Sequence, residues 1–316
     1  MEIKTLTRLK PVYWSIIIFI LAQGLTFLVI SHVNVFLAKN NLSLPIQSAE
    51  SVTIWPGTVT SSSGEVTQVP AESSLGPILI YFFVVVIVLG IVLFAIPISA
   101  LKTFFKVIFA FLYCWSIFVI SIIWLPTIAS IAIAVVIAVL WFFYPRVWLH
   151  SMVMLLAMVA LGEVFGRLIS PWTAMILLAV LAIYDFLAVR FGFMMWMANK
   201  LSESSTLPAF IIPYRQSNWI SNLKKSNFPT LTEQKAEERK YSILGGGDIG
   251  FPVLLAASVY FARNFKAAII VAVFSLAGLI GAYLIQAKFF KGKAVPALPP
   301  IAIMSVIGLA LVSFVL

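Results

Sequence analysis

Two aspartates lie inside long apolar stretches of this chain, where a carboxylate requires an explanation. Asp185 follows Tyr184 in the apolar run 181–187, and Asp248 follows the three glycines at 245–247. Placing an aspartate in hydrocarbon costs roughly 2.5 to 3.5 kcal/mol on insertion scales, so an acid within a membrane span indicates a functional site. Neither aspartate has an obvious basic partner within its own stretch. The sequence therefore predicts that the two acids need each other.

Two carboxyl groups that share one site can divide general acid and base work between them. The ionised aspartate takes a proton from water, and the protonated aspartate donates to the oxygen of a scissile carbonyl. This chemistry needs no metal and no covalent intermediate. The sequence contains no HExxH for zinc, and no glycine is followed two residues later by a serine nucleophile.

A third acid, Glu163, also lies in an apolar stretch. Arg167 follows it by four residues, which is the spacing of an ion pair on one face of a helix. We expect this pair to lie at the outer membrane interface and to have a structural role. The two histidines, His32 and His150, fall at the ends of apolar stretches, where we expect interfacial rings.

The composition indicates a membrane protein with several spans. Of 316 residues, 62% are hydrophobic and 10% charged, whereas apolar residues make up nearer half of a soluble domain. The net charge of +10 is explained by membrane orientation rather than by nucleic-acid binding. The single cysteine, Cys114, excludes an intrachain disulfide.

Nine apolar stretches are each close to the length that a helix needs to cross a bilayer. We expect an all-α polytopic fold and a single membrane domain over residues 1–316, with helices 1–6 within 12–191, a cytoplasmic loop at 192–241 and helices 7–9 within 242–316. Residues 32–75 are expected to form a loop, and part of 192–241 to be mobile or interfacial. Small residues at 277, 278, 281 and 282 favour close helix contact in the eighth span. The expected spans are 12–31, 77–97, 103–125, 127–144, 147–168, 172–191, 242–262, 265–286 and 295–316.

The lysines and arginines predict the orientation of these spans. With the N-terminus inside, 17 of the 21 basic residues fall on the inner side, so we expect N-in and C-out. Asp185 then lies about 20 Å below Trp172, and Asp248 about 22 Å below Arg263, at a rise of about 1.5 Å per residue. Both acids are thus expected at nearly one depth, in the inner half of the membrane.

The last expected span opens with Pro296, followed closely by Pro299 and Pro300. A proline at a helix start is ordinary. Three in five residues also leave backbone groups unpaired at membrane depth, and we hypothesise that these groups bind an extended substrate strand.

Together these motifs resemble the presenilin and signal peptide peptidase family of GxGD intramembrane aspartyl proteases, most closely its prokaryotic, archaeal-type members. The match comprises Tyr184-Asp185 in the sixth span, Gly245-x-Gly247-Asp248 in the seventh, and the Pro296-Ala297-Leu298 (PAL) motif at the ninth. The resemblance implies that Asp185 and Asp248 are catalytic. It also implies that substrate is bound by Tyr184, Gly245, Gly247, Pro296, Ala297 and Leu298.

The same resemblance implies an enzyme that acts on transmembrane peptides or proteins in a lipid bilayer, without metal or cofactor. We expect no nucleic-acid partner and no obligate partner subunit, while a homo-oligomer is compatible with the family. The expected location is a prokaryotic cell membrane, with the active site toward the cytoplasm. The N-in orientation is similar to presenilin, whereas signal peptide peptidase is inverted.

Two other functions are compatible with paired acids in a membrane. A prepilin-type aspartyl peptidase shares GxGD, although it usually has a charged residue soon after the GD and lacks the proline motif. A proton-coupled transporter or leak channel would use the acids as a relay. Peptide cleavage measured against liposome flux separates the channel and transporter class from the two proteases.

Overall fold

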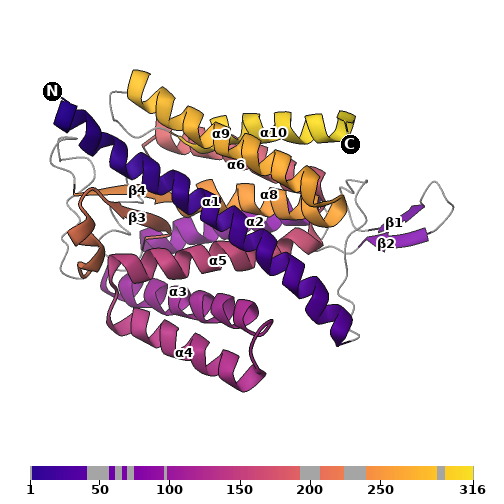
Figure 1. Ribbon diagram of the computed structural model, residues 1–316, viewed down its shortest axis with the longest axis horizontal. Helices are drawn as coiled ribbons and strands as arrows, with labels where there is room; N and C mark the ends of the chain where they lie inside the picture. The colour runs from indigo at the N-terminus through magenta and orange to yellow at the C-terminus, as the bar shows by residue number, and fades with distance from the viewer. Residues whose placement is uncertain are drawn as a thin grey trace.

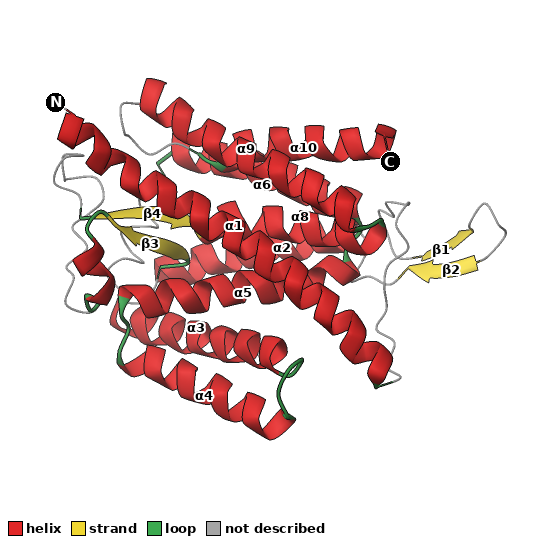
Figure 2. Ribbon diagram, viewed as in Figure 1, coloured by secondary structure: helices red, strands yellow, loops and turns green. Residues whose placement is uncertain are grey.

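The protein is a helical bundle in a computed structural model, which describes residues 2–40, 57–60, 66–69, 75–95, 98–192, 207–223, 240–289 and 296–315 (Figures 1 and 2). Nine α-helices lie in these described residues: α1 (Glu2–Lys39), α2 (Leu75–Ala95), α3 (Ile98–Ser121), α4 (Thr127–Phe143), α5 (Val147–Leu168), α6 (Pro171–Arg190), α8 (Gly246–Ala262), α9 (Phe265–Phe289) and α10 (Leu298–Val315). Two antiparallel sheets pair β1 (Gly57–Thr60) with β2 (Val66–Val69), and β3 (Ala209–Pro213) with β4 (Tyr241–Gly245). A short 3₁₀ helix spans Gln216–Ile220.

The predicted all-α multi-pass fold is confirmed, because each predicted span has its helix in the expected order. Five helices are long and apolar enough to cross a membrane, namely α1 from Pro11, α3, α5, α6 and α9. The apolar parts of α2, α4, α8 and α10 are shorter, and the 17 residues of α8 rise only about 26 Å. Many large apolar side chains face outward, among them Ile128 at 84% exposure, as expected of a surface in contact with hydrocarbon.

Several element ends differ from the prediction. The first helix runs on to Lys39, so the start of the predicted loop at 32–75 is helical, and β1 and β2 form a hairpin within the same segment. The seventh helix begins at Gly246 rather than at 242, because residues 241–245 form β4. The ninth begins at Leu298 rather than at 295.

The helix α8 runs through the middle of the bundle (Figure 1). One side packs in a core with α1 and α5, where Ile249 and Val253 are fully buried. Its other side packs in a core with α6, α9 and α10 through Leu254 and Leu255. A helix that is apolar on all sides is a buried helix. The bundle is therefore built around the segment that follows Asp248.

Glycines bring α5 and α8 close together along parallel paths. A Cβ at Gly246 of α8 would collide with Cε of Met154, and a Cβ at Gly250 would lie 2.6 Å from Sδ of Met158. Further along, a Cβ at Gly166 of α5 would lie 2.6 Å from the Cβ of Ala257. Small residues four apart allow this approach of two helices. The seam fixes α8 laterally against α5.

The close contact predicted for the eighth span exists at one of its small residues. A Cβ at Gly278 of α9 would lie 2.7 Å from the carbonyl oxygen of Pro300, so α10 passes directly over this glycine. Gly281, in contrast, faces open space. Ser275 and Ser305 join the two helices by a buried hydrogen bond of 2.7 Å.

The ion pair predicted at 163 and 167 is present, but it lies inside the protein rather than at an exposed interface. Arg167 donates to Oε1 of Glu163 at 3.0 Å, and both side chains are buried. Arg167 also donates to Asn34 of α1 at 3.1 Å and lies over the ring of Phe261 of α8 at 4.3 Å. The pair thus ties α1, α5 and α8 together.

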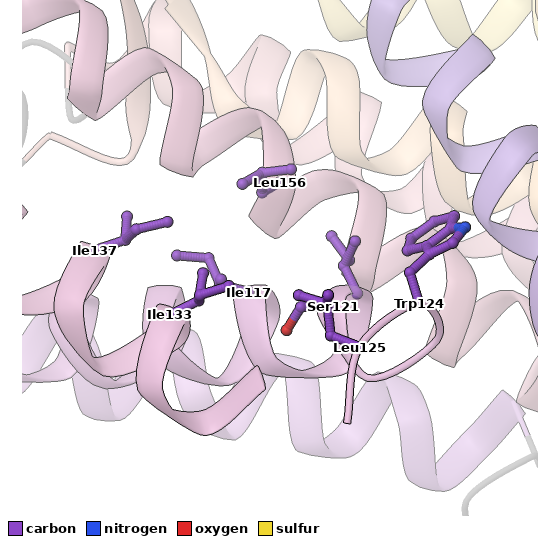
Figure 3. A pocket seen from close by; sticks show the side chains of 8 residues that line it. Ile117, Ser121, Trp124, Leu125, Ile133, Ile137 and Leu156 are labelled. Carbon is purple, nitrogen blue, oxygen red and sulfur yellow. The ribbon is translucent and has the colours of Figure 1, made fainter. Parts of the chain in front are cut away.

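One cavity of about 290 Å³ lies between α3, α4 and α5, and Figure 3 shows it from close by. Its walls are almost wholly apolar, and neither predicted catalytic acid lines it. The lining residues are Ile117, Ile120, Ser121, Trp124, Leu125, Ile133, Ile137 and Leu156.

Candidate active site

Asp185 is held within α6, fourteen residues after its first residue. The helix starts cleanly because Ser170 accepts a hydrogen bond from the Thr173 N–H at 3.1 Å and Pro171 occupies the first helical position. The Asp185 side chain is 9% exposed. Its Oδ2 accepts the backbone N–H of Leu298 at 3.3 Å, so the carboxyl group of α6 contacts the first residue of α10.

Asp248 lies at the third residue of α8. Gly245 caps this helix, and the Gly245 backbone hydrogen-bonds the Asp248 carboxyl group. An acid that reaches back from the third helical position to the cap is half of a capping box. The start of a helix is also its positive end, which favours a negative charge there. Helix geometry therefore places this carboxyl beside the strand that precedes it.

The glycines before Asp248 provide space for these contacts. A Cβ at Gly245 would lie 3.0 Å from Oδ2 of Asp248, and one at Gly246 would lie 3.0 Å from the carbonyl oxygen of Pro208. The Gly246 N–H donates to that same oxygen at 3.0 Å. The residue before β3 therefore approaches the backbone of Gly246 closely.

A proline, Pro252, follows Asp248 by four residues, where it removes the N–H that a helix would bond to the Asp248 carbonyl. The helix α8 continues through it from Gly246 to Ala262. Its ring is buried within the bundle, so the backbone group that it leaves unpaired is covered by protein.

The fold brings the two aspartates together from helices that are far apart in the sequence. Asp185 and Asp248 are close enough to interact electrostatically. Leu298 lies between their two segments: its N–H bonds Asp185, and its Cδ1 lies 4.0 Å from a Cβ built on Gly247. The three predicted motifs therefore meet at one place.

The proline motif forms the start of α10. The Ala297 carbonyl accepts the first helical bond, from Ile301 at 3.5 Å, so Leu298 is the first helical residue. Pro299 and Pro300 follow at positions where a helix needs no N–H. The Leu298 N–H has no acceptor within the first turn of the helix, and it donates to the Asp185 carboxyl group instead.

The remaining residues expected at the site lie around this meeting point. Tyr184 is partly buried on α6 and interacts electrostatically with Asp185. Pro296 and Ala297 are partly buried just before α10. Among the described residues, no three His, Cys, Asp or Glu side chains gather as a metal site would require.

The two-stranded sheet next to Asp248 was missed from the sequence. All five residues of β3 are buried, and Ala209 pairs with Gly245. The signal was present in the run of strand-forming residues at 210–212 between two prolines, Pro208 and Pro213. We expected this stretch to belong to a partly mobile loop, yet it forms the support of the site.

These elements match a known family over most of the chain. A family model described as signal-peptide peptidase, presenilin aspartyl protease matches residues 25–316. The chain belongs to this family. It is an integral, multi-pass membrane protein and an intramembrane aspartic endopeptidase, as the sequence motifs predict.

Solved structures from the presenilin family have the same fold. One is a presenilin family intramembrane aspartate protease in space group C222, with a TM-score of 0.59 and 17% identity over 97% of this chain and 100% of that one. The same kind of protein in space group P2 gives a TM-score of 0.58 and 16% identity over 95% of this chain and 96% of that one. No curated protein sequence matches the chain.

Proposed function

We propose that Asp185 and Asp248 are the catalytic pair of this intramembrane protease. The observation that carries the proposal is that two acids on α6 and α8 interact in a largely apolar interior, each with one hydrogen bond from the backbone. Because each carboxyl has a second oxygen, either can be ionised or carry a proton without losing its backbone contact.

The reaction needs one proton shared by the pair. The ionised aspartate removes a proton from water, whose oxygen attacks the scissile carbonyl carbon, while the protonated aspartate donates to the carbonyl oxygen. The tetrahedral species then breaks its C–N bond: the carboxyl that gained a proton from water passes it to the leaving amine, while the other aspartate takes a proton from a hydroxyl on the same carbon as the carbonyl re-forms. Each aspartate acts once as base and once as acid, so the pair ends the turnover with the single proton it began with.

The substrate is a membrane-spanning peptide or protein whose helix is opened at the cleaved bond. An intact helix hydrogen-bonds its own carbonyl groups, and an opened one needs other partners in hydrocarbon. We assign substrate contacts to the residues that surround the pair. These are Tyr184, Gly245, Gly247, Pro296, Ala297 and Leu298.

The active site faces the cytoplasm, with the N-terminus on the same side. This part of the proposal rests on the excess of basic residues on that side. It agrees with Figure 1, in which β3, β4 and the N-terminus lie at one end of the bundle and the C-terminus at the other. The enzyme is proposed to sit in a prokaryotic cell membrane and to work without an obligate partner subunit, as a monomer or homo-oligomer.

The test is cleavage of a labelled single-span peptide by purified protein in liposomes, with the products identified by mass. Asp185→Asn and Asp248→Asn are each expected to lower turnover by about 10²- to 10⁴-fold, and the double variant by no more than the worse single one. The double variant Glu163→Gln, Arg167→Met is the matched control, because it removes the third acid within the spans together with the buried charge that the single change would leave unpaired. Near-normal turnover in either Asn variant would refute the pair.

A further inference from the structure

His150 is a buried polar residue that the reaction described above does not use. It lies in the first turn of α5 and is 1% exposed. The expectation of an interfacial ring is therefore wrong for this histidine. Trp141 of α4 and Tyr113 of α3 pack around it, with ring centroids 6.0 and 6.2 Å away.

The two ring nitrogens of His150 have different and fixed partners. The indole N–H of Trp141 donates to Nδ1 at 3.2 Å. Since an indole nitrogen can only donate, Nδ1 must be the unprotonated nitrogen of a neutral ring. Nε2 then carries the proton and donates to the carbonyl oxygen of Ala209 in β3 at 3.1 Å. The structure thus selects one tautomer.

The Ala209 carbonyl is available because of the alternation within β3. Residues 208 and 214 bond toward the β4 side, since Pro208 O accepts from the Gly246 N–H and the Tyr214 N–H donates to Lys240 O. Backbone groups alternate in direction along an antiparallel strand, so the odd-numbered residues 209, 211 and 213 point theirs away from β4. Ala209 and Ile211 point toward α5, where His150 and Ser151 donate to their carbonyl oxygens. Pro213 has the same parity, so its missing N–H costs the ladder nothing.

Only a few contacts separate His150 from Asp248. Ala209 is the register partner of Gly245. Gly245 caps α8, and its backbone hydrogen-bonds the Asp248 carboxyl group. The Gly246 N–H donates to the carbonyl oxygen of Pro208, the residue just before Ala209. A shift of β3 would move the cap and the carboxyl with it.

We propose that His150 is a positioning residue for catalysis, whose Nε2–H bond to Ala209 fixes β3, and through β3 and β4 the carboxyl of Asp248. The inference rests on the proposed catalytic role of Asp248. His150 contacts no reacting atom in this scheme. Its donor holds in place the strand on which the start of α8 depends.

The first test compares two amides at position 150. Glutamine places its NH₂ near the position of Nε2 and can still donate to Ala209, whereas asparagine reaches only the position of Nδ1. His150→Gln is expected to keep kcat within about threefold of wild type, and His150→Asn to lose roughly 10- to 100-fold in kcat with little change in KM, as for a buried hydrogen bond. Turnover is counted per site titrated with a hydroxyl-bearing transition-state isostere, so that a smaller folded fraction does not lower it. Equal kcat values for the two variants would overturn the positioning role.

The second test leaves position 150 unchanged. The chain has only two histidines, so His32→Gln leaves His150 as the single ring for ¹⁵N NMR of the labelled protein. His32 is exposed on α1. The expected spectrum is that of a neutral ring protonated at Nε2. A ring protonated at Nδ1, or at both nitrogens at neutral pH, would overturn the inference.

The acid variants measured alongside separate the two proposals. Loss of turnover in Asp185→Asn and Asp248→Asn, with His150→Gln and His150→Asn equal, leaves the catalytic pair standing and rejects the positioning role. Turnover retained in the Asp248→Asn variant rejects the pair, and the positioning role with it.

Discussion

The backbone N–H of Leu298 donates to Oδ2 of Asp185 at 3.3 Å. Pro299 and Pro300, which follow it, have no N–H, so the Leu298 N–H is the backbone donor that remains in the first turn of α10. The hypothesis from the sequence was that this irregular backbone serves the substrate. In this structure its N–H serves one of the acids, so the proline motif also positions the proposed catalytic pair.

Leu298 can be tested for this role by two substitutions that differ in the N–H. Leu298→Pro removes the donor at a position whose backbone conformation proline accepts, and Leu298→Ala keeps the donor while shortening the side chain. A hydrogen bond to a charged group contributes about 1.5 to 3 kcal/mol, so we expect kcat to fall about 10- to 100-fold further in the Pro variant than in the Ala variant. The measurement is peptide cleavage at saturating substrate.

The side chain of Leu298 gives a separate prediction. It is buried beside Gly247 and packs in the core shared by α6 and α8, so Leu298→Ala is expected to lower stability and to raise KM. If the Ala and Pro variants had the same kcat, the N–H would have no part in catalysis and the motif would serve only to start α10.

The sequence was sufficient to predict the helices and the acids, because both have local signals. An apolar run of about 20 residues requires a helix in a bilayer, and a carboxylate inside such a run requires a function. The sheet of β3 and β4 has no such signal, since Ala209 and Gly245 are joined across 36 positions that include a charged segment. The burial of His150 follows from that same sheet, which covers the start of α5.

The close packing of the helices was predicted only where the small residues themselves formed a pattern. Gly278, in the pair with Ala282, was expected to be a contact, and it is one, but Gly281, in the pair with Ala277, faces open space. The seam at Gly166 and Gly250 joins two helices whose pairing is not encoded in either segment alone. Which face of a helix meets a neighbour is decided by the whole bundle, and a single sequence does not report it.

Gly246→Ala is expected to disturb the site because the added methyl group would clash with its neighbours, and not because alanine is unfavourable in the backbone conformation of this position. The new methyl group would collide with Cε of Met154 and lie 3.0 Å from the carbonyl oxygen of Pro208. The methionine end can move, but the Pro208 carbonyl belongs to the residue just before β3, the strand that supports Asp248. We expect a loss of about 1 to 3 kcal/mol in stability and a lower kcat. Thermal unfolding and cleavage assays measure the two effects.

Gly281→Ala is the matched control, since its methyl group would meet nothing within 4 Å. Alanine is favoured over glycine in a helix by up to about 1 kcal/mol, so this variant should be as stable as the wild type or more so. A destabilisation of equal size in both variants would show that the contacts with Met154 and Pro208 do not decide the effect at Gly246.

The buried pair of Glu163 and Arg167 is expected to matter for stability and not for catalysis. Arg167→Met would leave the Glu163 carboxylate buried without its partner, which costs about 3 to 5 kcal/mol, whereas the double variant Glu163→Gln, Arg167→Met removes both charges and should recover much of that loss. Phe261, over which Arg167 lies, is 13 residues beyond Asp248, or about 20 Å along α8. The kcat per folded enzyme should therefore stay near that of the wild type. A kcat that fell in the double variant although stability recovered would assign the pair a role in the reaction.

The dependence of the rate on pH tests whether Asp185 and Asp248 act as one unit. The reaction needs one proton on the pair, so the rate should rise as the first proton leaves the doubly protonated form and fall as the second leaves. The result is a bell, with both limbs belonging to the pair and not to one residue. Glu163→Gln should keep both limbs where they are, because this acid belongs to the structural pair with Arg167.

In oriented proteoliposomes the bell should follow the pH on the cytoplasmic side, toward which we propose that the site opens. A rate that climbed without a maximum from about pH 4 to about pH 9 would contradict a shared proton, and a bell that followed only the outer pH would contradict the proposed orientation.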